Sequence, residues 1–119
     1  MRTIELFSEK AITANASIET DVIDVAAYAI EGYFSLQLLV TGLGTIKVEY
    51  EVSNNGKIYV VQVDAADVIA SGFTATSGPG SDGKDLISFE PEPAKLMKIL
   101  ITETGGANAV AVSADLRIV

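Results

Sequence analysis

Apolar and polar residues alternate with a period of two over most of this chain. Successive side chains of a β-strand point to opposite faces, so such alternation predicts strands with one buried face and one solvated face. Residues 33–41 and 110–118 follow this pattern. The clearest case is residues 45–52, in which one face carries only apolar side chains: Ile46, Val48, Tyr50 and Val52.

Turn signals separate these strands. The sequence Asn-Asn-Gly at 54–56 predicts a hairpin to a partner strand at 58–63, because Asn and Gly adopt positive φ at low cost. Gly-Leu-Gly at 42–44 predicts a second tight turn, between the strands at 33–41 and 45–52. We therefore expect these three strands to form an antiparallel meander.

The remaining strands are shorter or less regular. Residues 96–102 carry apolar side chains on both faces, so we expect a central strand that is covered on both sides. A phase change in the alternation predicts a β-bulge near residues 21–24, and residues 26–31 fit either a helical turn or a loop. The other predicted strands are 4–7, 12–14, 18–25, 68–76 and 86–89.

About eight short strands with turns between them predict an all-β fold, an antiparallel sandwich of two sheets. Greek-key connections would make it jelly-roll-like, and an immunoglobulin-like sandwich is the alternative. The chain has 119 residues, 49% of them hydrophobic, and shows no linker or internal repeat, so residues 1–119 are expected to form a single domain with a full core. We see no membrane span and no signal peptide, and expect assembly in the cytoplasm.

Composition narrows the possible chemistry. The chain contains no Cys and no His, which excludes thiolate chemistry, a Ser-His-Asp triad and the commonest metal ligands. Its net charge of −8 opposes binding to nucleic acid. The carboxylates Glu49 and Glu51 share a strand face with Lys47, which is typical of a solvated, charge-mixed surface. We assign no catalytic residue and expect a protein that is not an enzyme.

One loop, residues 76–85, has a distinctive composition, with three Gly and one Pro. It is not a P-loop, because Asp85 follows Lys84 and a strand comes next, so no cofactor is assigned. Asp82 and Asp85 are weak candidates for a calcium site, although their spacing does not match an EF-hand. The residues that we regard as candidates for an interaction loop are Ser77, Gly78, Pro79, Gly80, Ser81, Asp82 and Gly83.

Six of the eight aromatic residues divide into two groups by position. Phe34, Tyr50 and Phe89 lie on faces that the alternation marks as core. Tyr28, Tyr33 and Phe73 are the candidates for exposed rings, which a sugar-binding surface would use.

Several segments together resemble small β-sandwich proteins encoded among bacteriophage and prophage structural genes. They are residues 6–15, 32–37, 41–45, 51–56, 77–83 and 96–106, and include Val-Ser-Asn-Asn-Gly at 52–56 and a Lys98-to-Gly106 hairpin motif. The resemblance implies a virion protein, either a capsid decoration or stabilising protein or a tail component, without catalytic residues. It implies a small symmetric homo-oligomer that contacts other virion proteins through strand edges and sheet faces. The alternative is a module that binds carbohydrate or a host surface.

Overall fold

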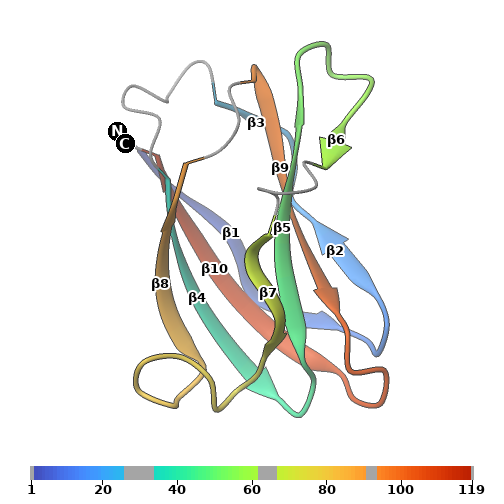
Figure 1. Ribbon diagram of the computed structural model, residues 1–119, viewed down its shortest axis with the longest axis vertical. Helices are drawn as coiled ribbons and strands as arrows, with labels where there is room; N and C mark the ends of the chain where they lie inside the picture. The colour runs from blue at the N-terminus through green and yellow to red at the C-terminus, as the bar shows by residue number, and fades with distance from the viewer. Residues whose placement is uncertain (1, 26–33, 62–66, 91–93, 119) are drawn as a thin grey trace.

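The computed structural model describes residues 2–25, 34–61, 67–90 and 94–118, which form two antiparallel sheets packed face to face (Figure 1). The first sheet has the order β1 (Arg2–Ile12), β10 (Val110–Ile118), β4 (Phe34–Gly42), β8 (Lys84–Phe89). In the second sheet, β9 (Leu96–Glu103) pairs with β2 (Ser17–Glu19), β3 (Ile23–Asp24) and β5 (Ile46–Ser53), and β5 also pairs with β6 (Val60–Val61) and β7 (Asp67–Phe73).

The strand pairs are nested along the chain, as in one long hairpin that has been rolled up. From the termini inward, β1 pairs with β10, β2 and β3 with β9, β4 with β8, and β5 with β6 and β7. This wiring is a jelly roll, which confirms the predicted two-sheet sandwich. The immunoglobulin-like alternative groups its strands differently and does not fit.

The predicted meander is wrong. β4 pairs with β10 and β8, whereas β5 pairs with β9, β6 and β7, so residues 42–44 carry the chain from one sheet to the other. A Cβ atom on Gly44 would lie 2.9 Å from the Asn108 carbonyl oxygen, so glycine permits this close crossing. Alternation reports which face of a strand is buried, but does not report which strand lies beside it.

The buried faces are those that the alternation predicts. The inward side chains of β4, β5, β9 and β10 form one core with Ile12, Ile23, Val25 and Phe73. The central position of β9 is confirmed, but its outer face is only half-buried, so the prediction that both sides are covered is wrong. The predicted hairpin after residue 53 forms, with Val60 and Val61 in the partner strand; residues 62–63 of that predicted strand lie outside the described residues.

The N-terminal strands differ most from the prediction. β1 is one strand of eleven residues, interrupted by two register shifts, in place of separate strands at 4–7 and 12–14. At the second shift Glu9 has a φ of 48°, and its N–H donates to Ser113 Oγ at 2.9 Å. The phase change near residues 21–24 corresponds to a break between β2 and β3. Residues 26–31 lie outside the described residues.

A buried carboxylate fastens three loops at one end of the sandwich. Glu103 is 1% exposed, and its two carboxylate oxygens accept four backbone N–H groups: those of Asn15 (3.1 Å), Thr45 (2.9 Å), Gly105 (2.8 Å) and Gly106 (2.8 Å). Asn15 belongs to the β1–β2 turn, Thr45 to the β4–β5 crossing, and the two glycines to the β9–β10 crossing. These hydrogen bonds lower the pKa of Glu103 from 4.5 to about 2.

Shortening a leucine to alanine should destabilise the fold at a buried position but not at an exposed one. Leu36 is fully buried on β4, so Leu36→Ala should lower the free energy of unfolding by about 2–5 kcal/mol. Leu43, 81% exposed in the β4–β5 crossing, supplies the matched control, and Leu43→Ala should change it by less than about 0.5 kcal/mol. Urea unfolding measures both; equal effects would contradict the assigned faces.

Replacing the carboxylate of Glu103 should have a pH-dependent effect. Because the folded state lowers this pKa from 4.5 to about 2, its stabilisation is complete above pH 4.5 and is lost as the pH falls towards 2. Glu103→Gln should therefore lower the melting temperature by several degrees at pH 7, with the difference shrinking between pH 4.5 and 2. Glu5→Gln, at an exposed position on β1, is the control. A difference that stayed constant down to pH 2 would contradict the assigned role.

Candidate functional site

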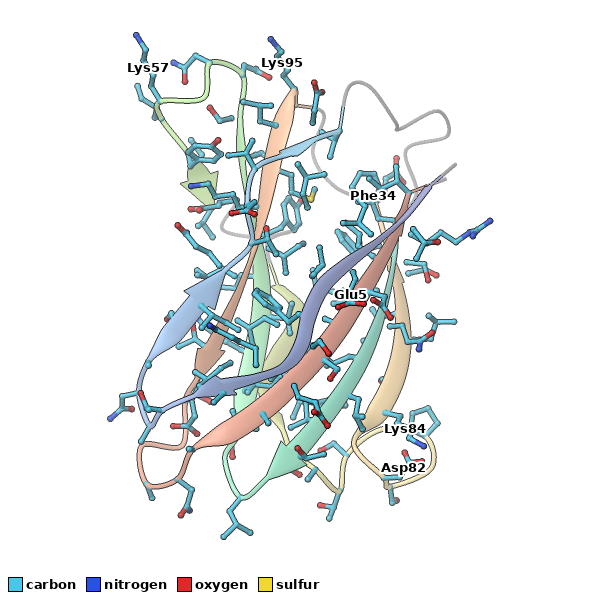
Figure 2. All side chains as sticks on the ribbon, turned by 180° about the vertical axis from the view of Figure 1, so that it is seen from behind. Glu5, Phe34, Lys57, Asp82, Lys84 and Lys95 are labelled. Atoms are coloured by element: carbon cyan, nitrogen blue, oxygen red, sulfur yellow. The ribbon has the colours of Figure 1, made fainter. Side chains whose placement is uncertain are left out.

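The loop that the sequence singled out forms one wall of a groove on the outer face of the first sheet. This groove, called here the outer-face groove, has a volume of about 490 Å³ and is lined from β4, β8, β10 and the 79–82 segment. Its apolar part comes from Leu39, Pro79 and Leu86, and Leu86 is 65% exposed. Figure 2 shows the labelled Asp82 and Lys84 at this loop, at the end of the molecule opposite Lys57.

Internal hydrogen bonds give the loop a defined shape. The N–H of Ser81 donates to the Gly78 carbonyl at 3.1 Å, and that of Gly83 donates to the Ser77 carbonyl at 2.9 Å. The Gly83 carbonyl accepts from the Val40 N–H at 2.9 Å, which ties the loop to β4. Gly83 has a φ of +77°, and a Cβ there would collide with the Val40 carbonyl, so only glycine suits this contact. The candidate loop is thus a rigid wall of the groove.

Four charged side chains line the outer-face groove: Asp82, Lys84, Asp85 and Asp115. The Asp82 carboxylate accepts the Lys84 N–H at 3.3 Å and lies 3.9 Å from its ammonium nitrogen. Asp115 stands directly opposite Glu5 on β1, which extends the acidic character towards the edge of the sheet. The groove therefore combines an apolar floor with a net negative rim.

The structure places both calcium candidates, Asp82 and Asp85, at the groove. Lys84 and Asp85 already belong to β8, so the loop is shorter than the sequence suggested. Each carboxylate has a local backbone partner, since Asp85 Oδ1 accepts the Leu86 N–H at 2.8 Å. Among the described residues no group of three or more potential metal-ligating side chains comes together. The calcium site stays a hypothesis that rests on two carboxylates.

A second charged cluster lies on the outer face of the second sheet, where sequence reasoning saw only a solvated surface. Lys98 lies 3.5 Å from Glu19 and stands opposite Glu51. Its ammonium is also 4.5 Å from the centre of the Tyr59 ring, a cation–π contact. Glu19 comes from β2 and Glu51 from β5, so only the strand order, with β9 between them, brings the cluster together.

The pKa of Glu51 is raised above 4.5. Burial is the largest cause, followed by a hydrogen bond to Glu19 and the charge of Glu19, whereas the charge of Lys98 acts in the opposite direction. Carboxyl groups in hydrogen-bond contact are closer than the roughly 5–9.5 Å that glycosidases use to flank a sugar bond. This pair therefore lacks the spacing of a glycosidase site. The sequence placed Glu51 on a solvated surface, and the structure shows that its side chain is half-buried there.

The aromatic side chains considered in the sequence analysis lie in the core or pack against it, as far as the structure describes them. Phe34 and Tyr50 are buried as predicted, and the Phe89 ring packs 5.7 Å from Phe34 and 5.8 Å from Tyr50, centre to centre. Phe73 is 7% exposed, so the prediction that it lies on the surface is wrong; it belongs to β7, which pairs with β5, and it is part of the core. Tyr28 and Tyr33 lie outside the described residues. No aromatic ring is among the described side chains that line the outer-face groove.

Exposed apolar side chains gather on the hairpin between β5 and β6, residues 54–61, called here the β5–β6 arm. Ile58 is 67% exposed and Val60 is 50% exposed. The Asn55 side chain holds the arm in shape, because its Oδ1 accepts the N–H groups of Lys57 at 2.9 Å and Ile58 at 3.0 Å. The sequence predicted the turn but not that the strand after it would present apolar residues to solvent.

Neutralising Glu51 should stabilise the fold at neutral pH. A raised pKa means that the folded state disfavours the ionised carboxylate, so Glu51→Gln, which keeps a hydrogen-bond partner for Glu19, should raise the melting temperature slightly at pH 7. The gain should vanish as the pH falls below 4.5, where the unfolded-state carboxyl is also protonated. Glu49→Gln should give no gain, because Glu49 loses its 3.0 Å ion pair with Lys47. Thermal melts from pH 3 to 8 test this; a Glu51→Gln loss at pH 7 would contradict it.

Comparisons with known proteins inform the fold and leave the function open. No family model matches the chain, and no curated protein matches it. Among solved structures, the crystal structure of tripeptidyl peptidase 2 (TPP II) is similar, with a TM-score of 0.59 and 14% sequence identity. The match covers 97% of this chain and 9% of that one, so this chain corresponds in length to a small part of that protein. The described residues contain no helix that is long and apolar enough to cross a membrane. The likeness supports the sandwich fold alone.

Proposed function

We propose that this chain is a non-enzymatic structural protein of a virion, a capsid decoration or tail component that acts through protein contacts. The observation that carries the proposal is the β5–β6 arm, on which exposed Ile58 and Val60 stand on a backbone fixed by Asn55. Apolar residues grouped on a rigid surface are typical of protein–protein contacts, where pre-ordering lowers the entropic cost of binding.

The remaining polar groups support a role without catalysis. Glu103 is engaged by four backbone N–H groups, and Glu19, Glu51 and Lys98 interact with one another on the second sheet. The chain has neither His nor Cys to act as a base or nucleophile. TPP II is a peptidase by name, but a likeness at 14% identity gives no reason to transfer an activity.

Among possible structural proteins, a virion protein is favoured by analogy with other proteins of this fold and by the sequence resemblance. Jelly rolls are common in viral capsid proteins, although the same fold also serves lectins and cupins. The segments that resemble phage structural proteins include Val52 to Gly56, which forms the base of the β5–β6 arm. The resemblance and the contact surface thus involve the same part of the chain.

Particle composition tests the proposal. Phage particles released by the cells that encode this chain are purified on a density gradient and analysed by quantitative mass spectrometry. The proposal predicts that the chain sediments with the particles in many copies and that deleting its gene removes it without removing the major capsid protein. Finding the chain only in the fractions without particles would overturn the virion role.

A module that binds carbohydrate or a host surface is the second candidate, and the outer-face groove favours it. Gln37, Ser113 and Asp115 supply hydrogen-bonding groups beside the apolar Leu39. The described lining lacks the aromatic ring on which sugars usually stack, so this candidate ranks second. A glycan array with the wild-type chain and with a variant in which Gly-Ser-Gly replaces residues 79–82 would support it by hits that the variant loses.

A further inference from the structure

We propose that the outer-face groove of one copy of this chain binds the β5–β6 arm of a second copy, so that copies join head to tail. The inference rests on the proposed structural function and names its partner. It comes from two surfaces that are complementary in shape, polarity and charge, but lie at opposite ends of the same molecule.

The arm supplies a basic, apolar projection. Lys57 is the one charged residue of segment 54–61, and Ile58 and Val60 follow it with large exposed fractions. Lys95 lies close by, because its N–H donates to Asn54 Oδ1 of the arm at 3.0 Å. Neither Lys57 nor Lys95 forms an ion pair within the described part of the chain. Among the described residues, β6 also ends the strand order of the second sheet, so no described strand pairs with its outer edge.

The groove supplies an acidic, apolar receptor. Three Asp residues and one Lys line it, and the single Lys is already matched to Asp82 at 3.9 Å. Leu39, Pro79 and Leu86 provide the apolar contact, and Leu86 is the large exposed apolar residue of β8. A volume of about 490 Å³ falls within the roughly 300–1,000 Å³ of typical ligand pockets. This is room for apolar side chains such as Ile58 and Val60, with Lys57 left at the acidic rim.

The two surfaces cannot meet within one copy. Figure 2 shows Lys57 and Lys95 at one end of the molecule, and Asp82 and Lys84 at the other. The long dimension of the molecule is 37 Å, and both sheets lie between the ends. A contact between different surfaces of two copies is heterologous, and repeating it gives a closed ring or an open filament. Either product would suit a virion component that is present in many copies.

Charge-reversal variants test this contact by analytical ultracentrifugation at about 0.15 M salt, where the Debye length of about 8 Å screens the mutual repulsion of chains with net charge −8. The wild-type chain should gain mass with concentration. Lys57→Asp reverses the charge on the arm, and Asp82→Lys reverses a charge at the groove. Each should weaken self-association by about tenfold or more. Thermal melts of both variants serve as the control for folding.

Mixing the two variants gives the decisive result. The intact groove of Lys57→Asp should accept the intact arm of Asp82→Lys, so the mixture should form one-to-one dimers that cannot grow, while each variant alone stays monomeric. Ile58→Ser should also weaken assembly, whereas Leu43→Ser, at an exposed leucine outside both surfaces, should not.

Three outcomes would overturn the inference. A wild-type chain that stays monomeric near 1 mM, a mixture without dimers, or association unaffected by Asp82→Lys would each exclude the arm-in-groove contact. The last result combined with a Lys57→Asp effect would point to arm-to-arm pairing. None of these outcomes decides whether the chain is part of a virion, which particle composition measures separately.

Discussion

The carboxylate of Glu103 is the constraint on which the loop end of this structure depends. Three connections, β1–β2, β4–β5 and β9–β10, turn at the same end of the sandwich, and each leaves backbone N–H groups that need acceptors. One side chain satisfies four of them and stays ionised. A buried charge is costly unless it is fully hydrogen-bonded, and here the four donors meet that requirement. The backbone hydrogen bond from the Thr104 N–H to the Thr45 carbonyl, at 2.8 Å, completes the junction between two crossings.

That junction holds the two connections by which the chain crosses between the sheets. The crossings in turn decide which strands lie side by side and which side chains share an outer face. Because both the β4–β5 and the β9–β10 connections cross between sheets, β4 pairs with β10 in the first sheet. The outer faces of these two strands carry Gln37, Leu39 and Asp115 side by side. The 74–83 loop then closes this face at one end through the Val40–Gly83 hydrogen bond. At the other end, β5 ends at Ser53, opposite Leu96 of β9, and the chain continues into the β5–β6 arm (Figure 1). The polarity of the molecule, an acidic groove at one end and a basic arm at the other, follows from the wiring.

The sequence predicted correctly those features that depend on local alternation alone. Alternation in residues 34–42, 46–53 and 110–118 identified the buried faces, since a strand of period two has no other way to hide Leu36, Tyr50 or Leu116. It failed where the outcome depends on pairing. Gly42-Leu43-Gly44 looks the same in a hairpin and in a crossing between sheets, so the predicted meander was wrong. Glu103 was not singled out, because neither of its sequence neighbours shows that three distant loops converge on it.

The candidate site shows the same division. The 77–83 loop stood out by its glycines, and Gly83 does occupy a position that requires one. Its partners in the groove, Leu39 on β4 and Asp115 on β10, come from strands far apart in sequence, so only the sheet order reveals them. The cluster of Glu19, Glu51 and Lys98 was missed for the same reason. Long-range register is the information that a single sequence lacks.

We propose that this chain acts through two specific surfaces, the outer-face groove and the β5–β6 arm. Hydrogen–deuterium exchange at low and high protein concentration measures this directly, residue by residue. Amides in the β5–β6 arm and around the groove, residues 57–61 and 80–86, should gain protection at high concentration, while the rest of the described chain is unchanged. Protection that is independent of concentration, or that appears instead along the β1 edge, would contradict it.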